Sequence, residues 1–281
     1  MPTLPRPLIE AVRRKSCVAF VGAGLSIPAG APSWKEFLKK LIDEGELDGM
    51  IENGNELRKH LDNGSYLEIS EFVRKSLGSH LSNQYLRRIF AISLKPTENH
   101  KILVDIPFRG IITTNYDKIL ETAYTMLWSR PPRILTWEDP ASMGTVLYDK
   151  DFFVFKLHGD IDRFESIIMT SRDYDNVMFR NPHIRTFLHA IFLTSTLLFI
   201  GYSMNDPDFQ MLMTELPLLF EGATPMSYAL LPDVPEILRK NYKDRMNITV
   251  LPYDAHDNHK EVTKILQELR NKARNESLQR A

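Results

Sequence analysis

"VAFVGAGLS", residues 18–26, is the stretch of sequence that decides the fold of this chain. Its first four residues are apolar, which is typical of a strand buried on both faces. Gly22 and Gly24 follow with one residue between them, and Ser26 comes shortly after. A turn rarely needs two glycines, so the pair indicates that another group approaches this backbone closely. A tight turn without any ligand is the alternative.

Five more short apolar runs recur along the chain: "GIITT" at 110–114, "FFVFKL" at 152–157, "TLLFIGY" at 196–202, "SYALL" at 227–231 and "ITVLPY" at 248–253. Most are almost continuously apolar, as strands of a parallel sheet are when helices cover both faces. Helical patterns lie between several of them, for example over residues 117–128 and after Pro207. This alternation predicts a doubly wound, mostly parallel, Rossmann-like α/β fold.

One long segment, residues 35–105, contains no convincing strand. Ser33 and Glu36 form a capping-box pattern that predicts a helix start at this point. A helical apolar stripe follows, made by Trp34, Phe37, Leu38, Leu41 and Ile42. We therefore predict a single domain over residues 1–281, with a helical subdomain inserted at 35–105.

Composition excludes several classes of protein. The chain has 281 residues, 43% of them hydrophobic, and a net charge of −1, so no overall attraction to nucleic acid or anionic lipid is expected. Its single cysteine, Cys17, permits neither an internal disulfide nor a cysteine-based zinc site. No apolar run approaches the ~18 residues of a membrane span. We expect a cytoplasmic protein that binds neither membranes nor, directly, nucleic acid.

Polar residues follow three further predicted strands, in "TTNYD" (113–117), "KLHGD" (156–160) and "GYSMNDPDF" (201–209). Because ligands of a doubly wound sheet bind at the carboxyl ends of its strands, we expect these segments to share one site with the glycine turn. Each segment also has a structural interpretation: Asn115 could cap a helix and His158 could be structural. The ordinary dinucleotide fingerprint needs a third glycine where Ile27 stands, which argues against a Rossmann dehydrogenase.

Together with "GAGLSIPAGAPSW", these segments resemble, in this order, the sirtuin superfamily, and more closely its bacterial branch of sirtuin-like NAD hydrolases in anti-phage defence. The resemblance covers roughly residues 15–255. Sirtuin deacylases carry a four-cysteine zinc module after their His-Gly pair, whereas no cysteine follows Gly159 here. Their first motif usually continues as Pro-Asp-Phe-Arg, where this chain has "PSWK" at 32–35. Both departures favour the hydrolase branch over protein deacylation.

The resemblance implies hydrolysis of the nicotinamide–ribose bond of NAD, which is the substrate, without a metal. His158 would be the catalytic base, and Asn115 and Asp117 would face the nicotinamide ribose. The remaining NAD-binding residues would be Gly22, Ala23, Gly24, Ser26, Thr114, Gly201 and Ser203. Two alternatives stay open: a non-catalytic module that binds NAD or ADP-ribose and signals to a partner, and an NAD-dependent protein deacylase.

An unrestrained NAD hydrolase would kill its host, so we expect control through assembly. We expect a homo-oligomer for this reason, and the resemblance implies, as a possible partner, an ATPase such as a HerA-type helicase or another defence-system protein. We expect the helical insertion at 35–105 to serve as both lid and interface, because it follows the glycine turn directly in sequence.

Overall fold

A seven-stranded parallel sheet forms the centre of the computed structural model, which describes residues 2–90, 94–149, 151–204 and 207–275. The strand order is β3-β4-β2-β1-β5-β6-β7, and every neighbouring pair is parallel. The strands are β1 (Cys17–Val21), β2 (Gly110–Thr113), β3 (Arg133–Leu135), β4 (Phe153–Lys156), β5 (Thr196–Ile200), β6 (Ser227–Pro232) and β7 (Ile248–Tyr253). The predicted doubly wound fold is confirmed.

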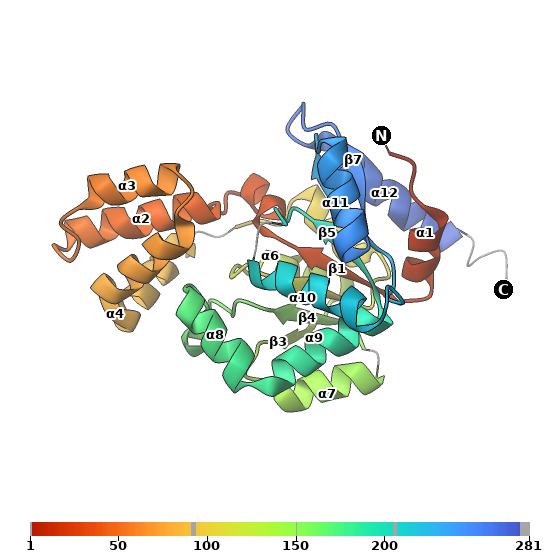
Figure 1. Cartoon of the computed structure of the whole chain (residues 1–281), viewed down its shortest axis with the longest axis horizontal. Coiled ribbons are helices and arrows are strands. Elements are labelled where there is room, and N and C mark those ends of the chain that lie inside the picture. The colour runs from red at the N-terminus through yellow and green to blue at the C-terminus, as the bar shows by residue number, and fades with distance from the viewer. Residues whose placement is uncertain (1, 91–93, 150, 205–206, 276–281) are drawn as a thin grey trace.

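Both faces of the sheet are covered by helices, because each central strand is apolar on both sides. In β1, Val18 and Phe20 face one core, and Cys17, Ala19 and Val21 face the other. The first core is closed by α7 (Pro140–Asp149), α8 (Ser171–Arg180), α9 (Pro182–Thr194), α10 (Pro207–Leu219) and α11 (Glu236–Met246). The second is closed by α1 (Arg6–Arg13), α5 (Glu98–Asp105), α6 (Ile119–Trp128) and α12 (Lys260–Asn275) (Figure 1).

Strand β3 is the one element of the sheet that the apolar runs did not predict. It has three residues, pairs only with β4, and lies at the edge of the sheet. Arg133 is exposed and only Leu135 is buried, so the strand lacks the continuous apolar run that marks its neighbours. A short edge strand of this kind gives no periodic signal.

Three helices of the insertion form a unit beside the sheet: α2 (Trp34–Leu47), α3 (Gly54–Asp62) and α4 (Tyr66–Phe90) (Figure 1). They share a hydrophobic core of their own, which includes most of the predicted stripe. The capping box at Ser33 and Glu36 is confirmed, and α4 is interrupted at Gly78. Helix α5 lies within the expected insertion but packs against α6 and α12. The division of the chain at 35–105 stays a prediction.

The insertion packs onto the loops that follow β2 and β4. Tyr116, just after β2, belongs to the core of the insertion, and its ring centroid lies 6.1 Å from those of Phe37 and Phe90. Ile167 and Met169, in the segment after β4, join the same core. The helical insertion therefore packs against the segments after β2 and β4, where the sequence predicts a ligand site.

Candidate functional site

The register of the sheet brings the predicted site segments to one edge. Four neighbouring strands end on residues that pair in a single row: Lys156, Thr113, Val21 and Ile200. Asn115 lies two residues after Thr113, the end of β2, and His158 lies two residues after Lys156, the end of the adjacent strand β4. The row includes the point between β1 and β5 where the strand order reverses. That reversal is where doubly wound sheets bind their ligands.

The glycine pair is required by the close approach of the loop after β5. The Gly22 N–H donates to the Ile200 carbonyl (3.1 Å) and the Gly24 N–H donates to the Gly201 carbonyl (2.9 Å). A Cβ atom on Gly22 would lie 2.6 Å from the Gly201 oxygen, and one on Gly24 would lie 2.9 Å from it. Gly201 itself has a φ of 62°. The group that approaches this backbone is thus the chain itself.

The same turn leaves few amides for a ligand. The N–H groups of Leu25 and Ser26 donate to the carbonyls of Gly22 (3.1 Å) and Ala23 (2.9 Å), which closes the short helix η1 (Ala23–Leu25). Within the described part of the chain, the Ala23 N–H has no acceptor. Gly24 is exposed. Binding of a pyrophosphate here stays a prediction. The Ala23 N–H and the exposed backbone of Gly24 are the parts of the turn that a pyrophosphate could contact.

Asn115 ties the end of β2 to the glycine turn. Its Nδ2 donates to the Gly22 carbonyl (3.2 Å) and to Ser26 Oγ (3.0 Å), and its N–H donates to Thr113 Oγ1 (3.1 Å). Both Asn115 and Ser26 are buried. The half-buried Thr114 donates its N–H to the Val21 carbonyl (3.3 Å). Asn115, Ser26 and Gly22 are therefore brought together by direct contacts.

Asp117 is directed toward a helix. Its Oδ1 accepts the N–H of Ile119 (3.0 Å), which is the first residue of α6. The side chain is buried at 7% exposure. This contact holds the loop after β2 against the start of α6.

His158 follows β4 after one intervening residue and is half-buried. Its ring lies edge-on to that of Tyr174, with the centroids 6.4 Å apart. The next residue, Gly159, has a φ of 94°, and a Cβ there would lie 2.2 Å from the Ser166 carbonyl oxygen. Gly159 is thus needed for the turn that follows His158 at the sheet edge.

The residues of the loop after β5 differ in their contacts with the rest of the site. Gly201 contacts the glycine turn, and Tyr202 is buried with its ring centroid 4.9 Å from that of Phe20. Ser203 is exposed, and none of the described residues forms a hydrogen bond with its side chain. Asn205 and Asp206, from the same motif, lie outside the described residues.

Sequence reasoning missed Lys156 and its partners. The side chain is fully buried, and Nζ donates to Glu121 Oε1 (2.9 Å) and lies 3.1 Å from Asp160 Oδ2. Burial by itself lowers the pKa of Lys156, but the two carboxylates outweigh it, so the pKa is raised and the ammonium stays protonated. A lysine inside the apolar run "FFVFKL" was the available signal.

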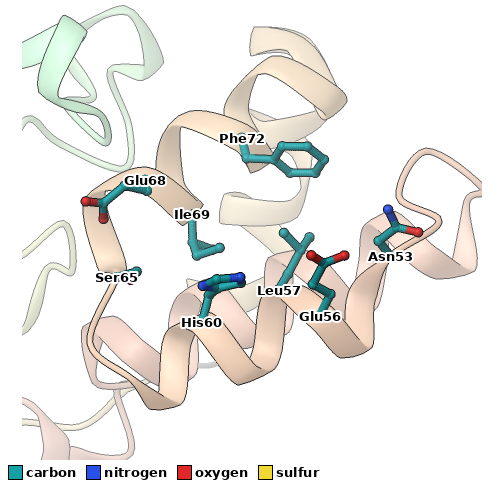
Figure 2. Close-up of a pocket in the computed structure, with 8 residues that line it drawn as sticks. All are labelled: Asn53, Glu56, Leu57, His60, Ser65, Glu68, Ile69 and Phe72. Atoms are coloured by element: carbon teal, nitrogen blue, oxygen red, sulfur yellow. The ribbon is translucent and has the colours of Figure 1, made fainter.

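A groove of about 500 Å³ lies in the helical insertion. It is formed by α3 and the start of α4 and is lined by Asn53, Glu56, Leu57, His60, Ser65, Glu68, Ile69 and Phe72 (Figure 2). Over the described ranges, no three His, Cys, Asp or Glu side chains gather as metal ligands. Nor does any described helix combine the length and apolarity that crossing a membrane requires.

Comparison with known proteins places the chain in a family. The family model described as "SIR2-like domain" matches residues 109–251, just over half of the chain. NAD(+) hydrolase ThsA of Cytobacillus dafuensis is 29% identical over 77% of this chain and 41% of its own length. NAD(+) hydrolase ThsA of Acinetobacter baumannii is 26% identical over 93% of this chain and 54% of its own.

A further relative, Defense-associated sirtuin 2 of Bacillus subtilis, is 29% identical over 74% of this chain but only 20% of its own length. The chain thus spans about half the length of the NAD(+) hydrolase relatives that it matches. Among solved structures, Sir2Tm bound to a propionylated peptide aligns with 93% of this chain and 94% of its own, at a TM-score of 0.43 and 13% identity. That likeness is too distant to inform the site.

Gly22→Ala should lower the free energy of unfolding by about 1–3 kcal/mol, because the new Cβ is forced against the Gly201 backbone. Urea denaturation measures the loss. Gly144→Ala is the matched control, since Gly144 lies within α7 with nothing within 4 Å of its Cβ position. That control should be neutral or stabilising by up to about 1 kcal/mol. A Gly22→Ala variant as stable as the parent would contradict the close approach.

Proposed function

The chain belongs to the family of SIR2-like domains, and from this premise we propose that it hydrolyses NAD to nicotinamide and ADP-ribose, as an NAD-depleting effector in anti-phage defence. One observation carries the proposal: Asn115 and His158 lie two residues beyond paired strand ends, and Asn115 bonds the glycine turn at the reversal of strand order. The names of the relatives, NAD(+) hydrolase ThsA and Defense-associated sirtuin 2, support it.

The proposed reaction makes modest demands on the protein. Nicotinamide leaves as a neutral molecule from a positively charged ring, so no carboxylic acid has to protonate it, unlike in ordinary glycosidases, and no Lewis acid is needed. His158 is the base that activates a ribose hydroxyl or the attacking water. Asn115 orients the ribose and the water: its Nδ2 is held by Gly22 and Ser26, which leaves its amide oxygen to accept. Asp117 holds the loop.

NAD binding is proposed along the strand ends on either side of the reversal point. The pyrophosphate lies against the turn of Gly22, Ala23, Gly24 and Ser26, where the Ala23 amide and the exposed Gly24 are its contacts. Thr114 and Gly201 border the same space, and Ser203 contacts the adenosine half.

Product analysis separates this proposal from its two alternatives. Purified protein with NAD alone should release nicotinamide and ADP-ribose. Release only in the presence of an acylated peptide would identify a deacylase. Binding of NAD or ADP-ribose without any release, alone or with candidate partner proteins, would identify a signalling module and overturn the proposed hydrolysis.

His158→Ala should reduce NAD cleavage by about 10²–10⁴-fold with the fold intact, because it removes the general base. Nicotinamide release measures the loss, and circular dichroism checks the fold. His256→Ala, which changes an exposed histidine after β7 and outside the insertion, is the control and should cleave at the parent rate. A folded His158→Ala variant with parent activity would show that another group is the base.

Asn115→Ala should also reduce cleavage strongly while retaining part of the NAD affinity. The variant loses the amide that orients the ribose, but the turn stays bonded to the loop after β5 through the Gly24 N–H and the Gly201 carbonyl. Calorimetric titration with NAD measures the affinity. Complete loss of binding in a folded variant would refute this division between binding and chemistry.

We extend the proposal to assembly: the protein works in the cytoplasm as a homo-oligomer, with an ATPase or helicase of the same defence system as a possible partner. The support lies in the insertion, since the core of α2 and α4 holds Tyr116, the neighbour of Asn115. Leu67 and Phe72 of α4 are 42% and 45% exposed. A chain bound at the insertion would therefore act on the Asn115 loop.

Light scattering with and without NAD and candidate partners should find a species larger than the monomer, with NAD cleavage rising as it forms. The physical reason is that assembly would hold the insertion, and through Tyr116 the Asn115 loop, in the competent position. A monomer at micromolar concentration that is fully active without any partner would refute the role of assembly.

A further inference from the structure

Lys156 lies at the centre of the two loops on which the proposed chemistry depends. It is the last residue of β4, and its side chain is 0% exposed. Nζ donates to the carbonyls of Tyr116 (3.0 Å) and Asp117 (2.7 Å), which belong to the loop after β2. The same ammonium binds two carboxylates, Glu121 of α6 at 2.9 Å and Asp160 at 3.1 Å.

These contacts flank both residues that act on the ribose. Asn115 immediately precedes Tyr116, and His158 lies between Lys156 and Asp160 in sequence. One buried ammonium thus holds the chain on the far side of Asn115 and on both sides of His158. The Asn115 side chain itself is held from the opposite direction, by its hydrogen bonds to Gly22 and Ser26.

Further contacts join the same two loops. The Leu157 N–H donates to the Thr113 carbonyl (2.8 Å), and the Ile161 N–H donates to the Tyr116 carbonyl (3.3 Å). That carbonyl also accepts from Lys156. On the surface, Lys118 forms an ion pair with Asp162. Water screens the exposed pair of Lys118 and Asp162, so it contributes little to stability. Removing a partner of the buried Lys156 ammonium would instead leave an uncompensated charge in the interior, which is costly.

We propose that Lys156 is a positioning residue for the chemistry at this edge: its ammonium clamps the loop after β2 to the "HGD" segment and so sets the geometry between Asn115 and His158. The use of that geometry for NAD cleavage rests on the function proposed above. The clamp itself is a property of the folded chain, and it can be tested without any turnover.

The experiment compares Lys156→Met with a triple variant, Lys156→Met/Glu121→Gln/Asp160→Asn. The triple variant removes the uncompensated carboxylates, so it keeps the proposal testable where the single variant does not fold. We expect the kcat for nicotinamide release to fall by about 10²-fold, because reacting groups are misplaced. The KM for NAD should change little, because the glycine turn is held separately by the loop after β5.

Arg109→Met is the matched control. Arg109 is also a buried cation, at 7% exposure, but it precedes β2 at the opposite edge of the sheet. It donates to Thr194 Oγ1 (3.1 Å) and Ser195 Oγ (2.9 Å). The control should lose stability without a change in kcat. This comparison separates positioning from a general cost of removing a buried charge.

Hydrogen exchange at the Ile119 and Ile161 amides gives the readout that is independent of activity. Both amides donate within the clamped loops, to Asp117 Oδ1 and to the Tyr116 carbonyl. Both should exchange faster in the Lys156 variants than in the parent, but not in Arg109→Met. Unchanged exchange, or the parent kcat in a folded triple variant, would overturn the clamp. A parent protein that never releases nicotinamide would overturn only the proposed function, and exchange would still decide the clamp.

Discussion

Backbone contact between the turn after β1 and the loop after β5 is the constraint on which the site depends. The two segments leave no room for a Cβ at Gly22 or Gly24, and Gly24 donates its amide to the Gly201 carbonyl. The contact joins the two halves of the sheet where the strand order reverses. It also uses up most of the amides that a glycine turn could offer to an anion. A ligand here has to bind on the open side of a turn that is already closed against the protein.

Two kinds of restraint then act on the chemistry. On the β1 side, the amide of Asn115 is held by neutral hydrogen bonds to Gly22 and Ser26. On the β4 side, the buried ammonium of Lys156 is held by Glu121 and Asp160. Removing one partner of a buried neutral hydrogen bond costs about 1–3 kcal/mol, whereas removing one partner of a buried ion pair costs about 3–5 kcal/mol. This division places the rigid element next to the proposed base and the softer one next to the proposed binding surface.

The sequence predicted the sheet well, because strands buried on both faces are almost continuously apolar and six of the seven carry such a run. It missed β3, which has only three residues and one buried side chain. It predicted from the glycine pair that some group approaches closely, but the identity of that group, the Gly201 backbone, depends on strand order. The partners of Lys156 come from two stretches of the chain, residues 116–121 and Asp160, and no local pattern records that the first stretch meets Lys156 in space.

Tyr116 explains how the insertion and the site act as one structure. Its ring packs with Phe37 and Phe90, its hydroxyl donates to the Ile168 carbonyl (2.6 Å), and its own carbonyl accepts from Lys156. Burial raises the pKa of its phenol, so the group stays a neutral donor. A shift of α2 or α4 acts on that ring, and because Asn115 is the adjacent residue, the shift reaches the proposed catalytic amide through a single peptide bond. The clamp at Lys156 resists such a displacement. The position of α2 and α4 and the geometry of the strand ends are therefore coupled through the packing of Tyr116.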